Sequence, residues 1–223
     1  MTTSVALRRR APRIWMFAAL QFLVVEFLVA GSWRGHYSYS YHFISDLGVP
    51  FCGPQGERPC SSMAALLNGS LLVVSAAYVS IAILWRARLR PYPLAATFAV
   101  AAGIGVAIVG SVPSNTIWAV HSLGATLFFV FGSLFTLLCG TAGVRVGMRG
   151  PGVAAQVIAV VGLTGFFCFT YSWDLGLGTG GIERVVAYSA LLGFVLGVYL
   201  LDRLPSAPAA ENLGGTETVA GSS

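Results

Sequence analysis

Very few side chains in this sequence can carry acid–base or ligand-binding chemistry, because 56% of its residues are hydrophobic and only 9% are charged. Three of them, Glu26, Asn68 and His121, fall inside long apolar runs. An ionisable or strongly polar group is costly to bury in hydrocarbon, so such a residue marks a candidate functional site. For Glu26 the competing interpretation is a structural hydrogen bond to another helix, and both interpretations stay open.

The remaining candidates lie at the edges of the apolar runs. Ser45 and Asp46 precede the second run, and Glu183 and Arg184 open the last. An arginine fork can donate two parallel hydrogen bonds to a phosphate or a carboxylate. The predicted ligand-binding residues are Glu26, Asp46, Asn68, His121, Glu183 and Arg184, and the candidates for a catalytic role are His121, Asp46 and Ser45.

Two kinds of catalytic centre can be drawn from these side chains. His42, His121 and Asp46 could converge on a metal, but no His-x-x-x-His or Glu-x-x-His pair occurs, so we predict no metal and no cofactor. A Ser/His/Asp centre can be drawn from Ser45, His121 and Asp174, although no nucleophile elbow surrounds the serine. Catalysis is therefore an open alternative.

The four cysteines divide into two pairs. Cys52 and Cys60 lie in a Pro/Gly-rich stretch between apolar runs. We predict a structural disulfide between them, because the outer side of a bacterial inner membrane permits disulfides. Cys139 and Cys168 fall inside apolar runs and are expected to be small buried hydrophobes.

The elements that must position these residues are membrane helices. A helix needs roughly 20 apolar residues to cross the hydrocarbon core. Six runs reach that length, and we therefore predict an all-α, polytopic membrane protein. The runs lie near residues 14–33, 63–85, 94–112, 117–144, 152–171 and 185–201.

The arginines predict how these helices are threaded. The chain has no lysine, and ten of its thirteen basic residues fall in alternate connections and at the two ends. By the positive-inside rule both termini are then cytoplasmic, and the six polar candidates lie toward the outer face. The expected organisation is a basic N-terminus over 1–13, a membrane domain over 14–204 with an external loop over 34–62, and a disordered cytoplasmic tail over 205–223. The sequence contains no basic stripe interleaved with aromatic residues, so it does not indicate nucleic-acid binding.

Two sets of glycines invite an interpretation. Four glycines, Gly176, Gly178, Gly180 and Gly181, look superficially like a dinucleotide-binding loop. No predicted strand precedes them and no βαβ unit surrounds them, so this interpretation is discarded. Gly193 and Gly197 form a small-xxx-small pair, which indicates close helix packing.

Four short motifs carry a family resemblance. They are Ile-Ser-Asp-Leu-Gly at 44–48, Asn68, His121 after the Gly-Ser-Val-Pro turn at 110–113, and Gly-Ile-Glu-Arg at 181–184. In these motifs, and over most of residues 14–201, the chain resembles the bacterial DUF998 family of six-helix membrane proteins. It is also similar to the wider Frag1/DRAM/Sfk1 group, whose members carry a similar Ile-Ser-Asp-x-Gly motif before the second helix and an asparagine within it.

What the resemblance implies is a six-helix membrane fold and, through the eukaryotic relatives, a link to lipid-anchor remodelling, membrane lipid organisation and autophagy. A more distant likeness to ceramidase-like hydrolases implies zinc held by serine, aspartate and three histidines. This chain lacks the late paired histidines of that group, which puts metal hydrolysis in doubt.

Together these observations predict a bacterial plasma-membrane protein with an outward-facing polar pocket for a lipid or a lipid-linked headgroup. Asp46, Glu183 and Arg184 are expected to hold the loops and the headgroup, with the three polar residues of the apolar runs as the inner wall. The partners are then membrane lipids, with a second copy or another membrane protein as further possibilities. The alternatives are a lipid hydrolase or transferase and, less favoured without paired broken helices, a small-solute transporter.

Overall fold

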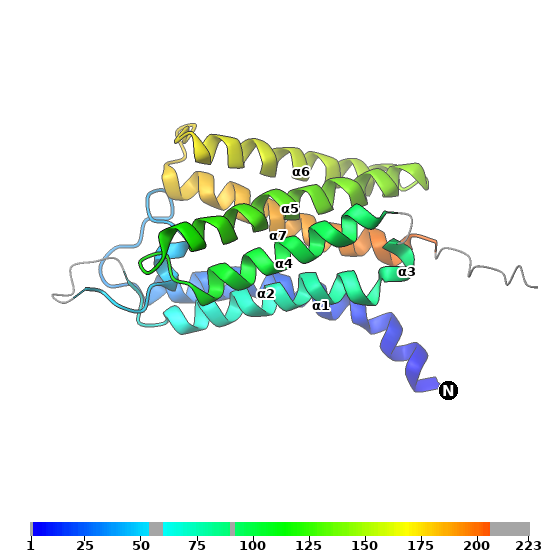
Figure 1. Cartoon of the computed structure of the whole chain (residues 1–223), viewed down its shortest axis with the longest axis horizontal. Coiled ribbons are helices and arrows are strands. Elements are labelled where there is room, and N and C mark those ends of the chain that lie inside the picture. Colours follow the sequence, from blue (N-terminus) through cyan, green and yellow to red (C-terminus); the bar gives the residue numbers. More distant parts are fainter. Residues whose placement is uncertain (1, 54–59, 90–91, 206–223) are drawn as a thin grey trace, which may run out of the picture.

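The computed structural model describes residues 2–53, 60–89 and 92–205 and shows an all-helical protein. No β-strand occurs in these three ranges, and Figure 1 shows the long helices side by side. The predicted tail falls outside the described residues from residue 206 onward. The elements are α1 (Thr2–Gly31), η1 (Ser45–Gly48), α2 (Ala64–Leu84), α3 (Arg86–Leu89), α4 (Pro93–Ser111), α5 (Trp118–Arg145), α6 (Arg149–Thr170) and α7 (Thr179–Arg203).

Six of these helices are long and apolar enough to cross a membrane, which confirms the predicted number and fold class. Most boundaries lie within three residues of the predicted ones. Two differ more: α1 begins at Thr2, well before its apolar run, and α7 begins at Thr179 instead of near residue 185. Hydropathy marks where a segment is apolar, and a helix can continue through polar or glycine-rich residues when its backbone groups find partners.

The helices form a closed ring in the order α1, α2, α4, α5, α6 and α7, with α7 returning to α1 and also packing on α5. Small residues set the close approaches, as is common between membrane helices. A Cβ atom on Gly105 of α4 would lie 2.5 Å from the carbonyl oxygen of Gly124 on α5. Gly193 and Gly197 of α7 face Thr136 and Phe135 of α5 in the same way, which confirms their predicted packing role.

Polar contacts of Arg88 stabilise one end of the ring. The Arg88 guanidinium donates to the backbone oxygens of Leu201 (3.1 Å) and Asp202 (2.7 Å) and to the Asp202 carboxylate (3.1 Å). A cation at a helix C-terminus satisfies its free carbonyls and its dipole. The opposite end carries η1 and is called the η1 end below. Both described ends of the chain lie away from it, at the Arg88 end (Figure 1).

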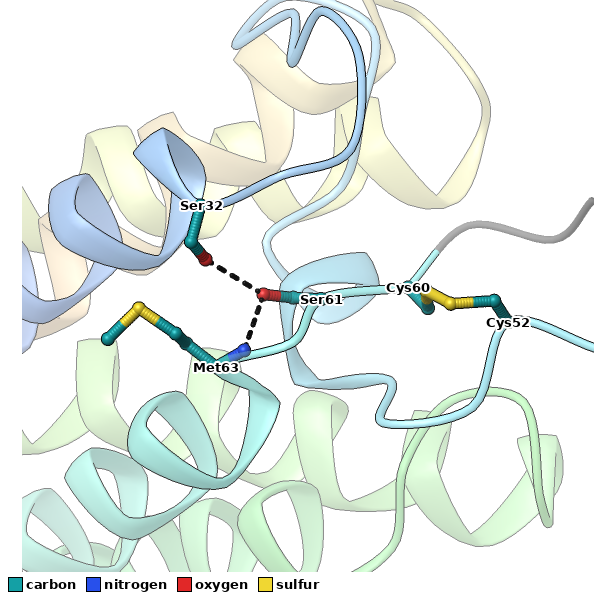
Figure 2. The surroundings of a disulfide bond; sticks show 5 residues. All are labelled: Ser32, Cys52, Cys60, Ser61 and Met63. Carbon is teal, nitrogen blue, oxygen red and sulfur yellow. Dashed lines mark hydrogen bonds between the residues drawn. A yellow bond between two sulfur atoms is a disulfide. The ribbon is translucent and has the colours of Figure 1, made fainter. Parts of the chain in front are cut away.

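A disulfide joins Cys52 to Cys60 in the connection between α1 and α2, as expected (Figure 2). Ser61, the next residue, fastens this connection to both helices. Its hydroxyl accepts a hydrogen bond from the Met63 amide (3.2 Å) and pairs with the Ser32 hydroxyl (3.3 Å). The disulfide therefore closes a short loop directly at the point where the connection is held to the bundle.

Alkylation of the denatured protein is expected to modify two of its four cysteines without reductant and all four after reduction. The two that react first are Cys139 and Cys168, which are buried free thiols. Intact-mass spectrometry counts the added groups. Cys52→Ser is the control, since it frees Cys60 and raises the count without reductant by one. Full modification before reduction would contradict the disulfide.

Candidate functional site

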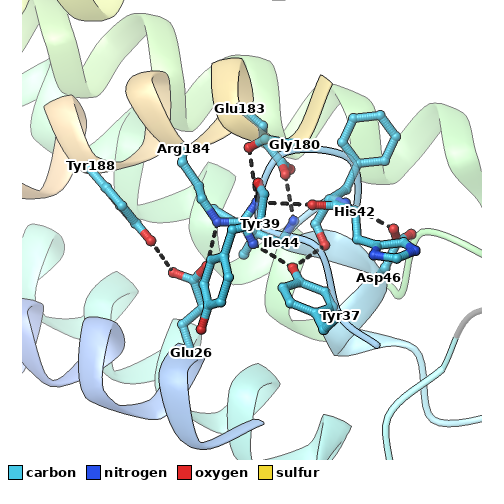
Figure 3. Close-up of polar contacts among 11 residues, drawn as sticks. Glu26, Tyr37, Tyr39, His42, Ile44, Asp46, Gly180, Glu183, Arg184 and Tyr188 are labelled. Atoms are coloured by element: carbon cyan, nitrogen blue, oxygen red, sulfur yellow. Dashed lines mark hydrogen bonds and ion pairs between the residues drawn. The ribbon is translucent and has the colours of Figure 1, made fainter. Parts of the chain in front are cut away.

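A buried ion pair joins α1 to α7 near the η1 end (Figure 3). Arg184 Nε donates to Glu26 Oε1 at 3.0 Å, and the Tyr188 hydroxyl donates to Glu26 Oε2 at 2.9 Å. Glu26 is only 1% exposed and Arg184 only 6%. Both oxygens of the carboxylate are therefore satisfied by side chains of α7, and the pair is a structural link between two helices that are distant in the sequence.

The rest of the Arg184 guanidinium holds the segment that follows α1. Its Nη1 donates to the backbone oxygens of Tyr39 (2.8 Å), His42 (2.9 Å) and Gly180 (2.9 Å). Its Nη2 donates to the Tyr37 hydroxyl. All three guanidinium nitrogens thus already donate to the protein. We call Glu26, Tyr37, Arg184 and Tyr188 the Arg184 cluster.

The phenol of Tyr37 both accepts and donates within this cluster. It accepts from Arg184 and donates to the Phe43 carbonyl at 2.9 Å. Burial raises the pKa of this phenol, against the opposing effect of Arg184, so the hydroxyl keeps the proton that it donates. The Tyr37 ring also stacks on His42 at 5.3 Å, which fixes the turn between them.

The first turn of α7 docks directly on the same segment. The free amides of Gly180 and Gly181 donate to the Ser40 carbonyl at 2.8 and 3.2 Å. Cβ atoms on Gly178 and Gly180 would collide with the carbonyl oxygens of Ser40 and His42, respectively. The glycines therefore allow two stretches of backbone to touch, a role that the sequence pattern did not reveal.

Asp46 and Asn68 hold η1 in place. The Phe43 amide donates to Asp46 Oδ2 at 3.0 Å, and Asn68 Nδ2 donates to the Gly48 carbonyl at 2.9 Å. Burial raises the pKa of the Asp46 carboxyl, while the Phe43 N–H and nearby cationic groups lower it. Asn68 also lines a small cavity, whereas Asp46 lines neither of the two cavities described next.

A cavity of about 610 Å³ lies between α5, α6 and α7 at the η1 end. A smaller cavity of about 50 Å³ adjoins it, because Ser45, His121 and Glu183 line both. The aromatic wall of the large cavity comprises Phe43, Trp118, Phe129, Phe166 and Phe169. Its polar lining includes Ser45, His121, Ser122, Thr126, Asp174 and Glu183.

His121 presents one ring nitrogen to this space. Its Nδ1 lies 2.7 Å from the Val112 carbonyl oxygen, which can only accept a hydrogen bond. Nδ1 therefore carries a proton, and in a neutral ring Nε2 is left with a lone pair. The residue is only 4% exposed and lines both cavities, so Nε2 is a buried acceptor at the cavity wall.

Glu183 is the second buried acceptor. The Ile44 amide donates to its Oε2 at 2.5 Å (Figure 3), and this is the one hydrogen bond that the described part of the chain gives the carboxyl group. Glu183 is 7% exposed and lines both cavities. One oxygen thus positions the loop before η1, and the other has no donor among the described residues.

Ser45, His121 and Asp174 all line the large cavity but do not form a hydrogen-bonded triad. The His121 nitrogen that would face the acid donates to Val112 instead, and Asp174 Oδ1 accepts from the Gly176 amide at 3.0 Å. A triad needs the acid on that histidine nitrogen. In the described ranges no three His, Cys, Asp or Glu side chains gather as metal ligands do.

The structure therefore sorts the predicted residues into three places. Ser45, His121, Glu183 and Asn68 line the cavities; Asp46 supports η1; Glu26 and Arg184 pair within the Arg184 cluster. Sequence reasoning missed the tyrosines and the aromatic wall. A signal existed for Tyr188, because it follows Arg184 by four residues and so shares its helix face.

Comparison with known proteins gives a family but no characterised relative. Residues 16–199 match the family model DUF998, described as a protein of unknown function. No curated protein and no solved structure matches the chain. The matched range includes most of α1, the whole of α2 to α6 and most of α7, with every residue of the Arg184 cluster and of both cavities. The chain therefore belongs to the DUF998 family.

Proposed function

We propose that this chain is a bacterial plasma-membrane protein whose large cavity binds the headgroup end of a lipid or lipid-linked molecule. The observation that carries the proposal is the cavity itself. Its volume of about 610 Å³ falls in the range of small-molecule sites. Most of its wall area is apolar, and Ser, Thr, His, Asp and Glu side chains also line it. An amphiphile suits a wall with aromatic and polar parts.

Three further observations support a membrane ligand. The cavity lies between helices of membrane-spanning length, so lipids surround the elements that form it. The Ile-Ser-Asp-Leu-Gly motif supplies Ile44 and Ser45 to the cavity walls. The likeness of this motif to the lipid-linked Frag1/DRAM/Sfk1 group points the same way.

The proposal includes an orientation in which both termini are cytoplasmic and the η1 end faces outward. The arginine distribution supports it, since ten of thirteen arginines lie in the connections and ends away from η1. A disulfide in the α1–α2 connection also suits an oxidising compartment. Alkylation in rapidly quenched cells tests this point, because a Cys52–Cys60 pair that is reduced there would contradict an outward loop.

In this proposal the Arg184 cluster supports the site and does not contact the ligand. The sequence alone predicts that Arg184 binds a phosphate or carboxylate of the headgroup. Its guanidinium instead donates to Glu26, to Tyr37 and to three backbone carbonyls. A ligand would have to displace these buried acceptors, which is costly because each would then lose its partner.

A lipid hydrolase or transferase is the second candidate, favoured by one observation. His121 and Ser45 line the same cavity, and they contribute a nitrogen with a free lone pair (Nε2) and a hydroxyl, respectively. A histidine with its other nitrogen fixed by a hydrogen bond can act as a general base. For a transporter the structure offers no such observation, since the six described spans run without the breaks typical of transporter sites.

Filling the cavity is expected to remove the bound lipid. Ala125 of α5 lines both cavities, so Ala125→Trp places an indole in their shared volume. Native mass spectrometry of the purified protein should show a lipid adduct on the wild type and its loss in this variant. The control is Leu123→Trp, two residues away on the same helix, where the side chain is 56% exposed.

The Ala125→Trp and His121→Ala variants separate the proposal from its competitors. Equal adducts on wild type and Ala125→Trp would place the lipid elsewhere and contradict the proposal. An adduct that the wild type converts to a product, and that His121→Ala retains unconverted, would establish the enzymatic candidate. Both variants must elute as folded protein in size-exclusion chromatography, because overpacking can cost about 1–3 kcal/mol.

A further inference from the structure

The polar part of the large cavity is built almost entirely from hydrogen-bond acceptors and hydroxyls. Two carboxyl side chains, Asp174 and Glu183, line it, and no arginine is among its described lining residues. The chain has no lysine at all. The hydroxyls of this wall can donate as well as accept, and that of Ser122 has no partner among the described residues, but the lining offers an anion no positive charge.

The two most buried polar residues of the wall both have an unused acceptor. Nδ1 of His121 donates to Val112, which leaves the lone pair of Nε2. One oxygen of Glu183 receives the Ile44 amide, and the other receives no donor from the described residues. The two residues are only 4% and 7% exposed, and both line the cavity, so a donor on a ligand in the cavity could pair with these two acceptors.

Two groups of the kind that usually bind phosphate, the first amides of α7 and the Arg184 guanidinium, are already occupied. A helix N-terminus is the usual anion site, because its first amides are free. In α7 the amides of Gly180 and Gly181 donate to the Ser40 carbonyl instead. The guanidinium of Arg184, the residue after Glu183, is committed to its own cluster, and Arg184 lines neither cavity.

We propose that the headgroup bound in this cavity is a hydrogen-bond donor without negative charge, either a hydroxyl-bearing polyol or a primary ammonium. This inference rests on the proposed function and adds the chemical class of its ligand. Nε2 of His121 and the free oxygen of Glu183 receive the donors of the headgroup, while the aromatic wall contacts the adjoining part of the chain. A phosphate would instead meet two carboxyl groups without a cation.

Three probes, each with one monounsaturated eighteen-carbon chain, test this inference: 1-oleoyl glycerol, oleylamine and 1-oleoyl glycerol 3-phosphate. Each is titrated into the delipidated protein in detergent, and native mass spectrometry measures the bound fraction. The phosphate probe is expected to bind at least ~10-fold more weakly than the better of the other two, as the loss of one good hydrogen bond or about 1.4 kcal/mol implies.

Substitutions distinguish the two donor headgroups. Glu183→Gln keeps an oxygen that can accept from the Ile44 amide and removes the carboxylate, so it should weaken oleylamine strongly and the glycerol probe only slightly. Asp174→Asn alters a second carboxyl in the loop before α7. This substitution also removes a negative charge from the cavity wall, at a position where the fold does not depend on buried contacts.

The outcomes separate this inference from the proposed function. Binding of the phosphate probe as tightly as the others, lost in Ala125→Trp, would overturn the headgroup class and leave the lipid site intact. Binding of all three probes unaffected by Ala125→Trp would overturn the site itself. Preference for the glycerol or amine probe that disappears in Ala125→Trp and changes in Glu183→Gln supports both.

Discussion

Glu26→Ala is expected to lower the free energy of unfolding by about 3–5 kcal/mol, the usual cost of removing one partner of a buried ion pair. The guanidinium of Arg184 would stay buried with its Nε donor unpaired, and the Tyr188 hydroxyl would lose its acceptor. For a chain of this size such a loss corresponds to a fall of about 10 °C in Tm. The segment after α1 should loosen as well, because Arg184 holds its carbonyls.

The chain offers a direct readout for this measurement. Cys139 and Cys168 are buried free thiols, one on α5 and one on α6, so a thiol-reactive dye reports unfolding of the bundle. Unfolding in detergent is compared between variants at one heating rate, since irreversible midpoints depend on it. The dye signal does not depend on Cys52 or Cys60, which are joined in the disulfide.

The matched control is the double substitution Glu26→Met with Arg184→Met. If the cost of Glu26→Ala comes from an unpaired buried charge, removing both charges should restore part of the stability, as replacing buried pairs with apolar residues often does. The remaining loss reflects the carbonyls of Tyr39, His42 and Gly180, which lose their Arg184 donor. Tyr188→Phe removes one neutral-to-charged hydrogen bond and should cost only about 1.5–3 kcal/mol. A midpoint for Glu26→Ala equal to that of the wild type would show that the pair is dispensable.

Gly178→Ala is the second substitution with a large expected effect. Gly178 has φ 77° and ψ 165°, a conformation that is essentially restricted to glycine. Its Cβ would also collide with the Ser40 carbonyl, the acceptor of the first amides of α7. We expect a loss on the order of 4 kcal/mol, because backbone strain and a backbone clash add at one position.

Gly176→Ala separates these two contributions. Gly176 has a similar φ of 80°, but no atom lies within 4 Å of its added Cβ. It should cost only the strain of a positive φ, about 1–2 kcal/mol. The same thiol dye measures both variants. Equal midpoints for the two would mean that the contact with Ser40 contributes nothing.

The Gly178 variant also tests whether the docking of α7 matters for the site. Thr179 and Glu183 in its first turns line the large cavity. If α7 shifts away from Ser40, the lipid adduct should weaken in Gly178→Ala and persist in Gly176→Ala. Loss of the adduct in both variants would instead indicate that the whole loop before α7 contributes to binding.

The residues that local sequence reasoning placed correctly are those whose position depends on local composition. Six apolar runs predicted six membrane helices, because bilayer thickness dictates the length of each span. Cys52 and Cys60 were paired correctly, since they lie close together in one short connection. Contacts among the polar candidates link Glu26 to Arg184, Glu183 to the loop before η1 and Asn68 to η1, and a common end of the bundle is expected because alternate helix ends share a membrane face.

Only the tertiary structure decided what each polar side chain contacts. Glu26 and Arg184 are 158 residues apart, and nothing local shows that the arginine is occupied by a carboxylate of α1. The role of Gly178 depends on Ser40 of a distant loop, and the acceptor nitrogen of His121 depends on the Val112 carbonyl. Hydropathy and spacing determine which segments cross the membrane, whereas hydrogen-bond partners and cavities depend on how those segments face one another in the folded bundle.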